Sequence, residues 1–153
     1  IPVLRKDFII DPLQVAESYA MRADCILLIA AALPTSLLSE LESQALSYGM
    51  DCLLEVHDEE DVEKAMSCKS TLIGINNRNL EDFSVSLETS IRLNKIIPTT
   101  KLVISESGIK NSKDIKLLTD NGIKTFLIGE TFIRQDCPGL ALKKLLSSCS
   151  ESD

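Results

Sequence analysis

Short apolar runs and helical patterns alternate along the whole chain. Six apolar runs have the length of strands, and they cover residues 2–5, 24–30, 51–56, 70–76, 101–107 and 124–129. Inside most of these runs the apolar residues are continuous and do not alternate with polar ones. This is typical of strands that are buried on both faces of a parallel sheet. The pattern therefore predicts an α/β fold with a parallel sheet.

The segments between the runs carry signals for the start and end of helices. Four polar residues precede helical patterns and are expected N-caps: Asp11, Asp58, Ser86 and Asn111. Gly49 and Gly122 are expected to end two of the helices. A last helix is expected from about Gly139, leading into a polar tail at about residues 147–153. Because the strand and helix unit repeats without a linker, we expect one domain over residues 1–153.

Two architectures accept this pattern: an open doubly wound sheet and a (β/α)8 barrel. The first run is not followed by glycine, and the chain contains no GxGxxG or GxxxxGK[ST] motif. Polar residues instead end or follow nearly every run, as the active site of a barrel requires. The last two runs end in SESGI and LIGET, where a glycine precedes a helix start, and barrels commonly bind phosphate at the loops after their last two strands. A closed barrel takes about 250 residues. The sequence therefore predicts an incomplete TIM (β/α)8 barrel of about six units, with about two absent.

Composition narrows the classes of function. The 153 residues are 44% hydrophobic with a formal net charge of -7, which disfavours nucleic acid and anionic membranes as partners. The longest apolar run, Cys25 to Leu33, is far shorter than the roughly 20 residues that cross a bilayer. Five cysteines without a CxxC pair argue against a disulfide framework or a zinc cluster, so we expect a cytoplasmic protein in which Cys25 and Cys52 are small buried hydrophobes.

The strand ends carry the candidate chemistry. Lys6 and Glu55 end different runs, so a barrel would bring an ammonium donor and a carboxylate to one mouth, where they suit proton transfer. Taken singly, each is also explained as a structural salt bridge or a solvated charge at the rim. Asn76 and Arg78 suit a hydroxyl and a carboxylate of a substrate, although Asn76 is equally explained as a loop cap.

Other reactive side chains are not expected to form a site. Ser107 lacks the GxSxG context of a nucleophile, and His57, the sole histidine, has no cysteine partner and is interpreted as a partly exposed loop residue. The acidic run 58–61 is interpreted as the start of a helix, because successive carboxylates on one turn point in different directions. No metal site is expected.

Six segments, in this order and spacing, resemble a known family: PVLRKDFIIDPLQV, ADCILLIAAAL, LSYGMDCLLEVHDEED, IGINNRNLEDF, ISESGI and FLIGETFI. They are similar to the third through eighth strand units of indole-3-glycerol-phosphate synthase, the (β/α)8 enzyme of tryptophan biosynthesis. The resemblance implies a carboxy-lyase that needs no cofactor. It would close the ring of 1-(2-carboxyphenylamino)-1-deoxyribulose 5-phosphate, with loss of carbon dioxide and water, to give indole-3-glycerol phosphate.

The resemblance also implies roles for individual residues. Lys6 would be the general acid at the substrate carbonyl, Glu55 would assist dehydration, and Asn76 would position the substrate. Substrate contacts are implied for three residues: Phe8 beside the aromatic ring, Arg78 at the active-site loop or the substrate carboxylate, and Ser107. Gly108 and Gly129, with the backbone amides around them, would hold the phosphate of this small-molecule substrate.

Family members also carry an N-terminal helix and two earlier strand units, including a Glu and a Lys on the first strand, that have no counterpart here. We therefore expect a fragment, a truncated reading frame or one part of a split enzyme. Its open sheet edges would bind the missing N-terminal segment or a second copy. Two alternatives stay open: a non-catalytic phosphate-binding barrel fragment, and a related barrel isomerase such as phosphoribosylanthranilate isomerase, against which LRKDF and LLEV argue.

Overall fold

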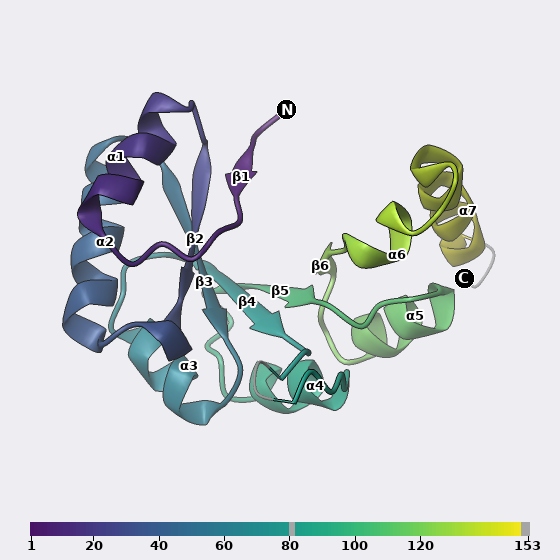
Figure 1. Ribbon diagram of the computed structural model, residues 1–153. Coiled ribbons are helices and arrows are strands. Elements are labelled where there is room, and N and C mark those ends of the chain that lie inside the picture. The colour runs from purple at the N-terminus through teal and green to yellow at the C-terminus, as the bar shows by residue number, and fades with distance from the viewer. Residues whose placement is uncertain (80–81, 151–153) are drawn as a thin grey trace. The chain divides into compact units, whose positions relative to one another are not determined.

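Strands and helices alternate along the chain in the computed structural model, which describes residues 1–79 and 82–150, with side chains to residue 147 (Figure 1). The strands are β1 (Leu4–Arg5), β2 (Cys25–Ile29), β3 (Asp51–Val56), β4 (Leu72–Asn76), β5 (Leu102–Glu106) and β6 (Thr125–Leu127). The helices are α1 (Pro12–Ala20), η1 (Ala30–Ala32), α2 (Thr35–Ser47), α3 (Glu59–Met66), α4 (Glu88–Asn94), α5 (Ser112–Asp120), α6 (Glu130–Ile133) and α7 (Pro138–Ser150). The strand order in the sheet follows the sequence from β1 to β6, which confirms the α/β prediction.

The chain consists of two compact units. The first comprises Ile1–Gly74 and Ile97–Leu102, and the second comprises Ile75–Ile96 and Val103–Asp153. In the first unit β1, β2 and β3 pair in parallel, and in the second β5 and β6 do so.

In the first unit, β2 and β3 are buried almost along their whole length, and α1 and α2 lie side by side against them (Figure 1). The fully buried side chains of this core include Ile26, Leu28, Leu38, Leu41 and Leu54. Apolar stripes of the helices cover the strands, which explains why the apolar runs are continuous. Burial of each such side chain contributes about 1.5–3 kcal/mol.

The charges that follow β1 have separate roles. The Arg5 guanidinium donates hydrogen bonds to the Gln14 carbonyl and the Ser18 hydroxyl, each at 3.0 Å, and so fastens α1 to the strand. Asp7 lies 3.3 Å from the same guanidinium. Arg5 and Asp7 are therefore structural, whereas Lys6, between them in sequence, is not part of this anchor.

In the second unit, Ile91, Ile109, Leu118 and Ile123 form a buried cluster against which Phe126 of β6 packs. Helix α5 begins as predicted, because Asn111 accepts hydrogen bonds from the amides of Lys113 and Asp114. The predicted cap at Ser86 is wrong. Leu87 precedes α4 without a side-chain cap, and the Ser86 amide instead donates to the Asn77 carbonyl as part of the preceding loop. The short helices η1 and α6 were not predicted, because neither reaches the length at which an apolar period is visible.

The cysteines whose side chains the structure describes are Cys25, Cys52, Cys68 and Cys137, and all are free thiols. Cys52 and Cys68 are buried, and Cys25 is partly buried. Burial, with a smaller contribution from the charge of Asp51, raises the pKa of the Cys25 thiol to about 11, and burial raises the pKa of Cys52 as well. These thiols therefore stay protonated and act as small apolar groups. The side chain of Cys149 lies outside the described residues.

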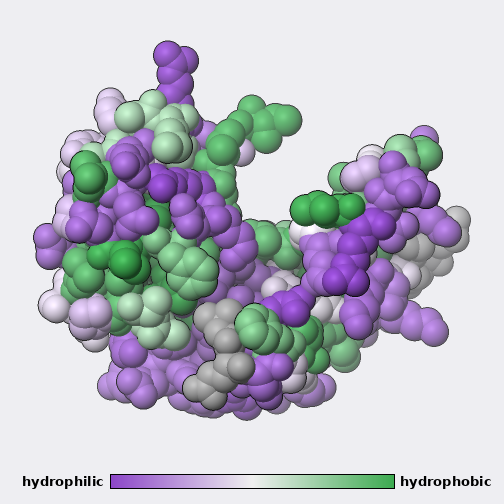
Figure 2. All heavy atoms as spheres, viewed as in Figure 1, coloured by the Kyte–Doolittle hydropathy of each residue, from purple (hydrophilic) through white to green (hydrophobic). Residues whose placement is uncertain are grey.

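Exposed apolar side chains gather near both ends of the chain. Ile1 and Val3 project at the N-terminal segment, and Ile133 and Leu140 are exposed on or beside α6 and α7. Figure 2 shows the hydrophobic N-terminal segment standing out into solvent. Among the described helices, none has both the length and the apolar character that a bilayer crossing requires.

Glu42 provides a test of the first unit. This carboxylate on α2 is 1% exposed and accepts hydrogen bonds from the amides of Lys69 and Ser70, at 2.9 and 2.6 Å, just before β4. We expect Glu42→Leu to lower the free energy of unfolding by about 3 kcal/mol, because two buried N–H groups lose their acceptor. Glu42→Gln keeps one acceptor and should cost less.

The exposed Glu40 on the same helix is the control. Glu40→Leu should change stability by no more than about 0.5 kcal/mol in chemical denaturation. Equal losses for the two leucine variants would contradict a structural role for the Glu42 carboxylate.

Candidate active site

A lysine and a carboxylate meet at the strand ends of the first unit. Lys6 follows β1, Glu55 lies near the end of β3, and the Lys6 Nζ donates to the Glu55 Oε2 at 3.0 Å. The strand register accounts for this contact. Arg5 of β1 lies opposite Ile26 of β2, and Ile29 at the end of β2 lies opposite Glu55 of β3. The Lys6 and Glu55 side chains therefore lie at the same edge of these parallel strands. Glu55 is 2% exposed, whereas Lys6 is 41% exposed. The result is a carboxylate withdrawn from water beside a partly accessible ammonium.

His57 lies next to this pair, in the turn after β3. The prediction of a partly exposed loop residue is confirmed, because the side chain is 15% exposed in the bend after β3, and its Nε2 lies 3.6 Å from Glu55 Oε1. Sequence reasoning missed this contact. A signal was present in the spacing of Glu55, His57 and Asp61, but it does not fix the direction of the ring.

Phe8 is placed differently. Its ring is exposed, and the residue contributes its backbone to the segment before α1: the amide donates to Asp7 Oδ1 and the carbonyl accepts from Gln14. The ring is thus accessible to a ligand from solvent.

Two consecutive asparagines follow β4 in the second unit. The Asn76 side-chain oxygen accepts from the Arg78 amide at 3.0 Å, so the loop-cap interpretation of Asn76 is correct for that atom. Asn77, which the sequence analysis did not select, is 2% exposed and donates from Nδ2 to Ser105 Oγ, the Glu106 carbonyl and the Ser107 carbonyl at 2.9–3.1 Å. It therefore fixes the end of β5 to the loop after β4.

The end of β5 leads into a turn of two left-handed residues. Ser107 has φ 65° and Gly108 has φ 81°. A Cβ on Gly108 would lie 2.6 Å from Val85 Cγ1, so glycine is required here by backbone angle and by packing. Glu106, directly before the turn, is 1% exposed and is a second buried carboxylate at a strand end that the sequence analysis did not select.

Gly129 forms a second glycine turn, between β6 and α6. The space around it is open, because a Cβ there would meet nothing within 4 Å. Thr131 donates to the Ile109 carbonyl at 2.5 Å, so the turns that contain Gly108 and Gly129 are connected by a side-chain hydrogen bond.

Arg78 is held by a carboxylate of its own unit. Its guanidinium lies 2.5 Å from Glu130 Oε2, and Arg134 lies 2.6 Å from the other oxygen of Glu130. This ion pair joins the loop after β4 to the residue after Gly129. Arg78 is therefore well placed to order the loop.

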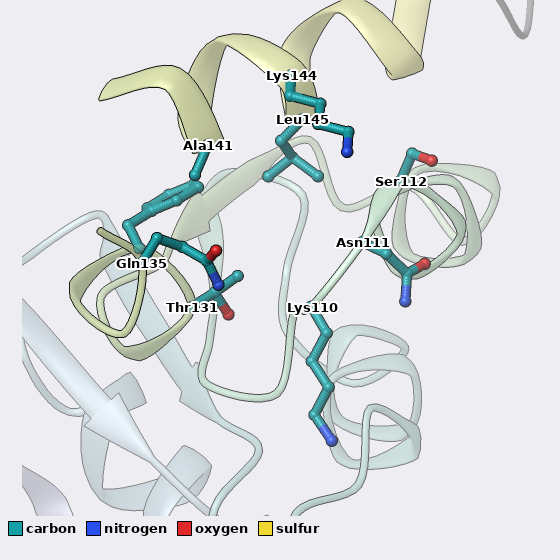
Figure 3. Close-up of a pocket in the computed structure, with 9 residues that line it drawn as sticks. Lys110, Asn111, Ser112, Thr131, Gln135, Ala141, Lys144 and Leu145 are labelled. Carbon is teal, nitrogen blue, oxygen red and sulfur yellow. The ribbon is translucent and has the colours of Figure 1, made fainter. Parts of the chain in front are cut away.

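A pocket of about 460 Å³ lies beside the second glycine turn, between the start of α5 and the helices α6 and α7 (Figure 3). Lys110, Asn111 and Ser112 line it from one side, and Thr131, Gln135 and Lys144 line it from the other. The first amides of α5 are occupied by Asn111, while Asp114 accepts from the amides of Lys110 and Asn111. An anion in this pocket would therefore meet side chains such as Lys144, and not the occupied amides of the helix start (Figure 3).

Among the residues that the structure describes, no group of three or more histidines, cysteines or carboxylates is arranged to hold a metal ion. The first unit offers a proton donor beside a buried carboxylate. The second offers the Ser107–Gly108 turn, which is packed against Val85, and Gly129, beside which the space is open.

Comparison with known proteins gives a consistent result. The family model described as indole-3-glycerol phosphate synthase matches residues 1–145. A relative with this name from Polaromonas naphthalenivorans is 52% identical over 145 residues, which are 95% of this chain and 55% of the relative. One from Delftia acidovorans is 49% identical over 147 residues, which are 96% of this chain and 55% of the relative. The chain thus spans about half the length of the curated relatives that it matches.

Solved structures share the fold at low sequence identity. The 3-hexulose-6-phosphate synthase of Salmonella typhimurium aligns with a TM-score of 0.81 at 13% identity, over 99% of this chain and 74% of that one. Tryptophan synthase from Pyrococcus furiosus aligns with a TM-score of 0.70 at 14% identity, over 98% of this chain and 65% of that one. These are TIM-barrel proteins, so the incomplete barrel predicted from the sequence is confirmed.

Asn77 gives a test of the second unit. Asn77→Ala removes three donated hydrogen bonds and the acceptor for the Ser90 amide, and it leaves buried partners unsatisfied. We expect a loss of about 2–4 kcal/mol in the free energy of unfolding. Asn121→Ala, at an exposed asparagine that donates to a single carbonyl, is the control and should cost less than about 1 kcal/mol. Equal losses of unfolding free energy for the two variants in urea denaturation would contradict the role of Asn77 in fixing the end of β5 to the loop after β4.

Proposed function

The chain belongs to the indole-3-glycerol phosphate synthase family, and we propose that it supplies six of the strand units of an enzyme that catalyses the reaction named for that family. The substrate would be 1-(2-carboxyphenylamino)-1-deoxyribulose 5-phosphate. The ring carbon that bears the carboxylate would bond to the substrate's carbonyl carbon, carbon dioxide would leave, and loss of water would give the indole.

The Lys6 and Glu55 pair carries this proposal. When the new carbon–carbon bond forms, the carbonyl oxygen becomes a hydroxyl and needs a proton, which Lys6 supplies. Loss of that hydroxyl as water needs a proton delivered to the oxygen and a proton removed from the ring system, and Glu55 assists in this step. The 3.0 Å contact between the two groups lets a proton pass between them within hydrogen-bond reach.

The second unit would bind the substrate. Backbone amides around Gly108 and Gly129 would hold the phosphate, because two adjacent glycine turns allow close approach of the main chain to an anion. Asn76 would position the reacting part of the substrate, with Ser107 and Phe8 as further contacts. Arg78, paired with Glu130, would order the loop around it.

The complete reaction would need more than these residues, since the chain spans about half of its relatives' length. The exposed apolar residues near both chain ends, such as Val3 and Ile133, support contact with the absent barrel units or with a second copy. We assign the protein to the cytoplasm as part of the same proposal. A non-catalytic phosphate-binding protein is the alternative, and the Lys6 and Glu55 pair favours the enzyme.

Lys6→Met tests the catalytic assignment. The variant is made in the 153-residue chain joined at Ile1 to the first two strand units of the Polaromonas naphthalenivorans relative. We expect kcat for indole-glycerol phosphate formation to fall by about 10²–10⁴-fold, because the carbonyl loses its proton donor.

Lys69→Met, at an exposed lysine before β4, is the matched control and should keep wild-type kcat. Circular dichroism should show the same fold for both variants. Undiminished kcat in Lys6→Met would exclude Lys6 from the mechanism, and a wild-type fusion without any turnover would support the non-catalytic alternative.

Phosphate binding at the glycine turns is tested with inorganic phosphate and the 153-residue chain. We expect the backbone amide NMR signals of Gly108 and Gly129 to shift on titration. Gly129→Asp should abolish the shifts, because the open space at Gly129 accepts the side chain without strain while its charge repels the anion.

Gly139→Asp is the control, because its Cβ position is equally open and lies on α7. This variant should bind phosphate like the wild type. Shifts confined to the lysines of the neighbouring pocket, Lys110 and Lys144, would show that the anion binds there and not at the glycine turns.

A further inference from the structure

His57 lies between two carboxylates from different elements. Its Nε2 is 3.6 Å from Glu55 Oε1 on β3, and its Nδ1 is 3.5 Å from Asp61 Oδ2 in the first turn of α3. Asp61 also accepts the backbone amide of His57 at 3.0 Å, so the main chain of the residue is held. Neither ring nitrogen forms a hydrogen bond, so the imidazole faces the two carboxylates through electrostatic contacts, with Nε2 toward Glu55 and Nδ1 toward Asp61.

These contacts extend the catalytic pair into a line of alternating charge. Lys6 approaches one oxygen of Glu55, and His57 approaches the other. Asp61 follows His57, and Lys64 lies 3.9 Å from Asp61. When the histidine is protonated, Lys6 and His57 both face the Glu55 carboxylate, and His57 and Lys64 both face the Asp61 carboxylate.

The charges that face the ring favour the imidazolium. Burial lowers the pKa of His57, but the carboxylates of Asp61, Glu55 and Asp58 together raise the pKa above its usual value. The stabilisation from these contacts is therefore complete below the ordinary histidine pKa of about 6.5 and disappears as pH rises through the higher pKa of the folded state.

We propose that His57 is a positioning residue for Glu55: anchored by Asp61, it holds one oxygen of the Glu55 carboxylate and so presents the other to Lys6. The assignment of a catalytic effect rests on the proposed function. In this arrangement Asp61 orients the His57 ring, the ring orients the Glu55 carboxylate, and the carboxylate contacts Lys6. Loss of the imidazolium removes one of the two positive charges that face the Glu55 carboxylate.

The first test needs no activity. His57 is the sole histidine, so its ring signals in NMR are unambiguous in the 153-residue chain. We expect the His57 pKa to lie above its ordinary value in the wild type and to fall in Glu55→Gln and in Asp61→Asn, because each variant removes a carboxylate that faces the ring. Lys6→Met, at a partly exposed side chain, should raise the pKa of His57, because Glu55 loses its competing cation.

Glu63→Gln is the matched control, because Glu63 is exposed on the same helix α3 and should leave the titration unchanged. Circular dichroism of each variant reports whether the fold is kept. A His57 pKa that responds equally to Glu63→Gln and Glu55→Gln, or not at all to Glu55→Gln and Lys6→Met, would overturn the proposal.

The second test uses the fused enzyme described above. His57→Gln keeps a neutral donor that can reach Glu55 and should retain kcat within about tenfold, but the alkaline limb of the pH profile of kcat due to His57 should be lost. His57→Leu should lower kcat by a larger factor than it changes KM. Activity with an unchanged pH profile in both variants would contradict the positioning role. If the wild-type fusion is inactive, the proposed function fails, and the NMR titrations still decide whether His57 holds Glu55.

Discussion

Burial of the parallel strands on both faces constrains everything else in this molecule. Strands such as β2 and β3 are covered along nearly their whole length, so an unpaired charge within them would be desolvated at high cost. Polar side chains are accepted mainly where a strand ends. Four polar residues lie at such ends: Lys6, Glu55, Asn76 and Asn77. Of these, Glu55 is held by an ion pair with Lys6, and Asn77 is held by hydrogen bonds to the end of β5. The fold thus concentrates the chemistry at the strand ends.

The sequence predicted the elements well where a local physical signal exists. The run at residues 51–56 matches β3, and the caps at Asp11, Asp58 and Asn111 are confirmed because each side chain accepts an amide of its own helix start. Ser86 failed because its backbone is bonded to Asn77, a contact nine residues away that no cap pattern encodes. Local signals therefore predicted elements, whereas long-range hydrogen bonds moved their boundaries.

The candidate site shows the same difference between what local sequence signals predict and what long-range contacts determine. Strand ends indicated Lys6 and Glu55 because parallel strands share an edge, and the structure places these two side chains in contact. The contact of His57 with Glu55 depends on ring orientation, and the Arg78 and Glu130 pair joins residues far apart in sequence. Neither follows from spacing. Asn77 was missed because two adjacent asparagines have the same type, and only the structure shows which one turns into the core.

Charge pairing sets how an acidic chain could bind a phosphorylated substrate. With a formal net charge of -7, the protein has no summed positive field to attract an anion. Two cations expected to meet the substrate are already in ion pairs, Lys6 with Glu55 and Arg78 with Glu130. A dianionic phosphate would have to break these pairs or bind elsewhere, and backbone amides at glycine turns carry no side-chain partner that must be displaced. The open space at Gly129 and the requirement for glycine at position 108 therefore agree with the proposal that the main chain holds the anion, which would leave Lys6 to act on the carbonyl.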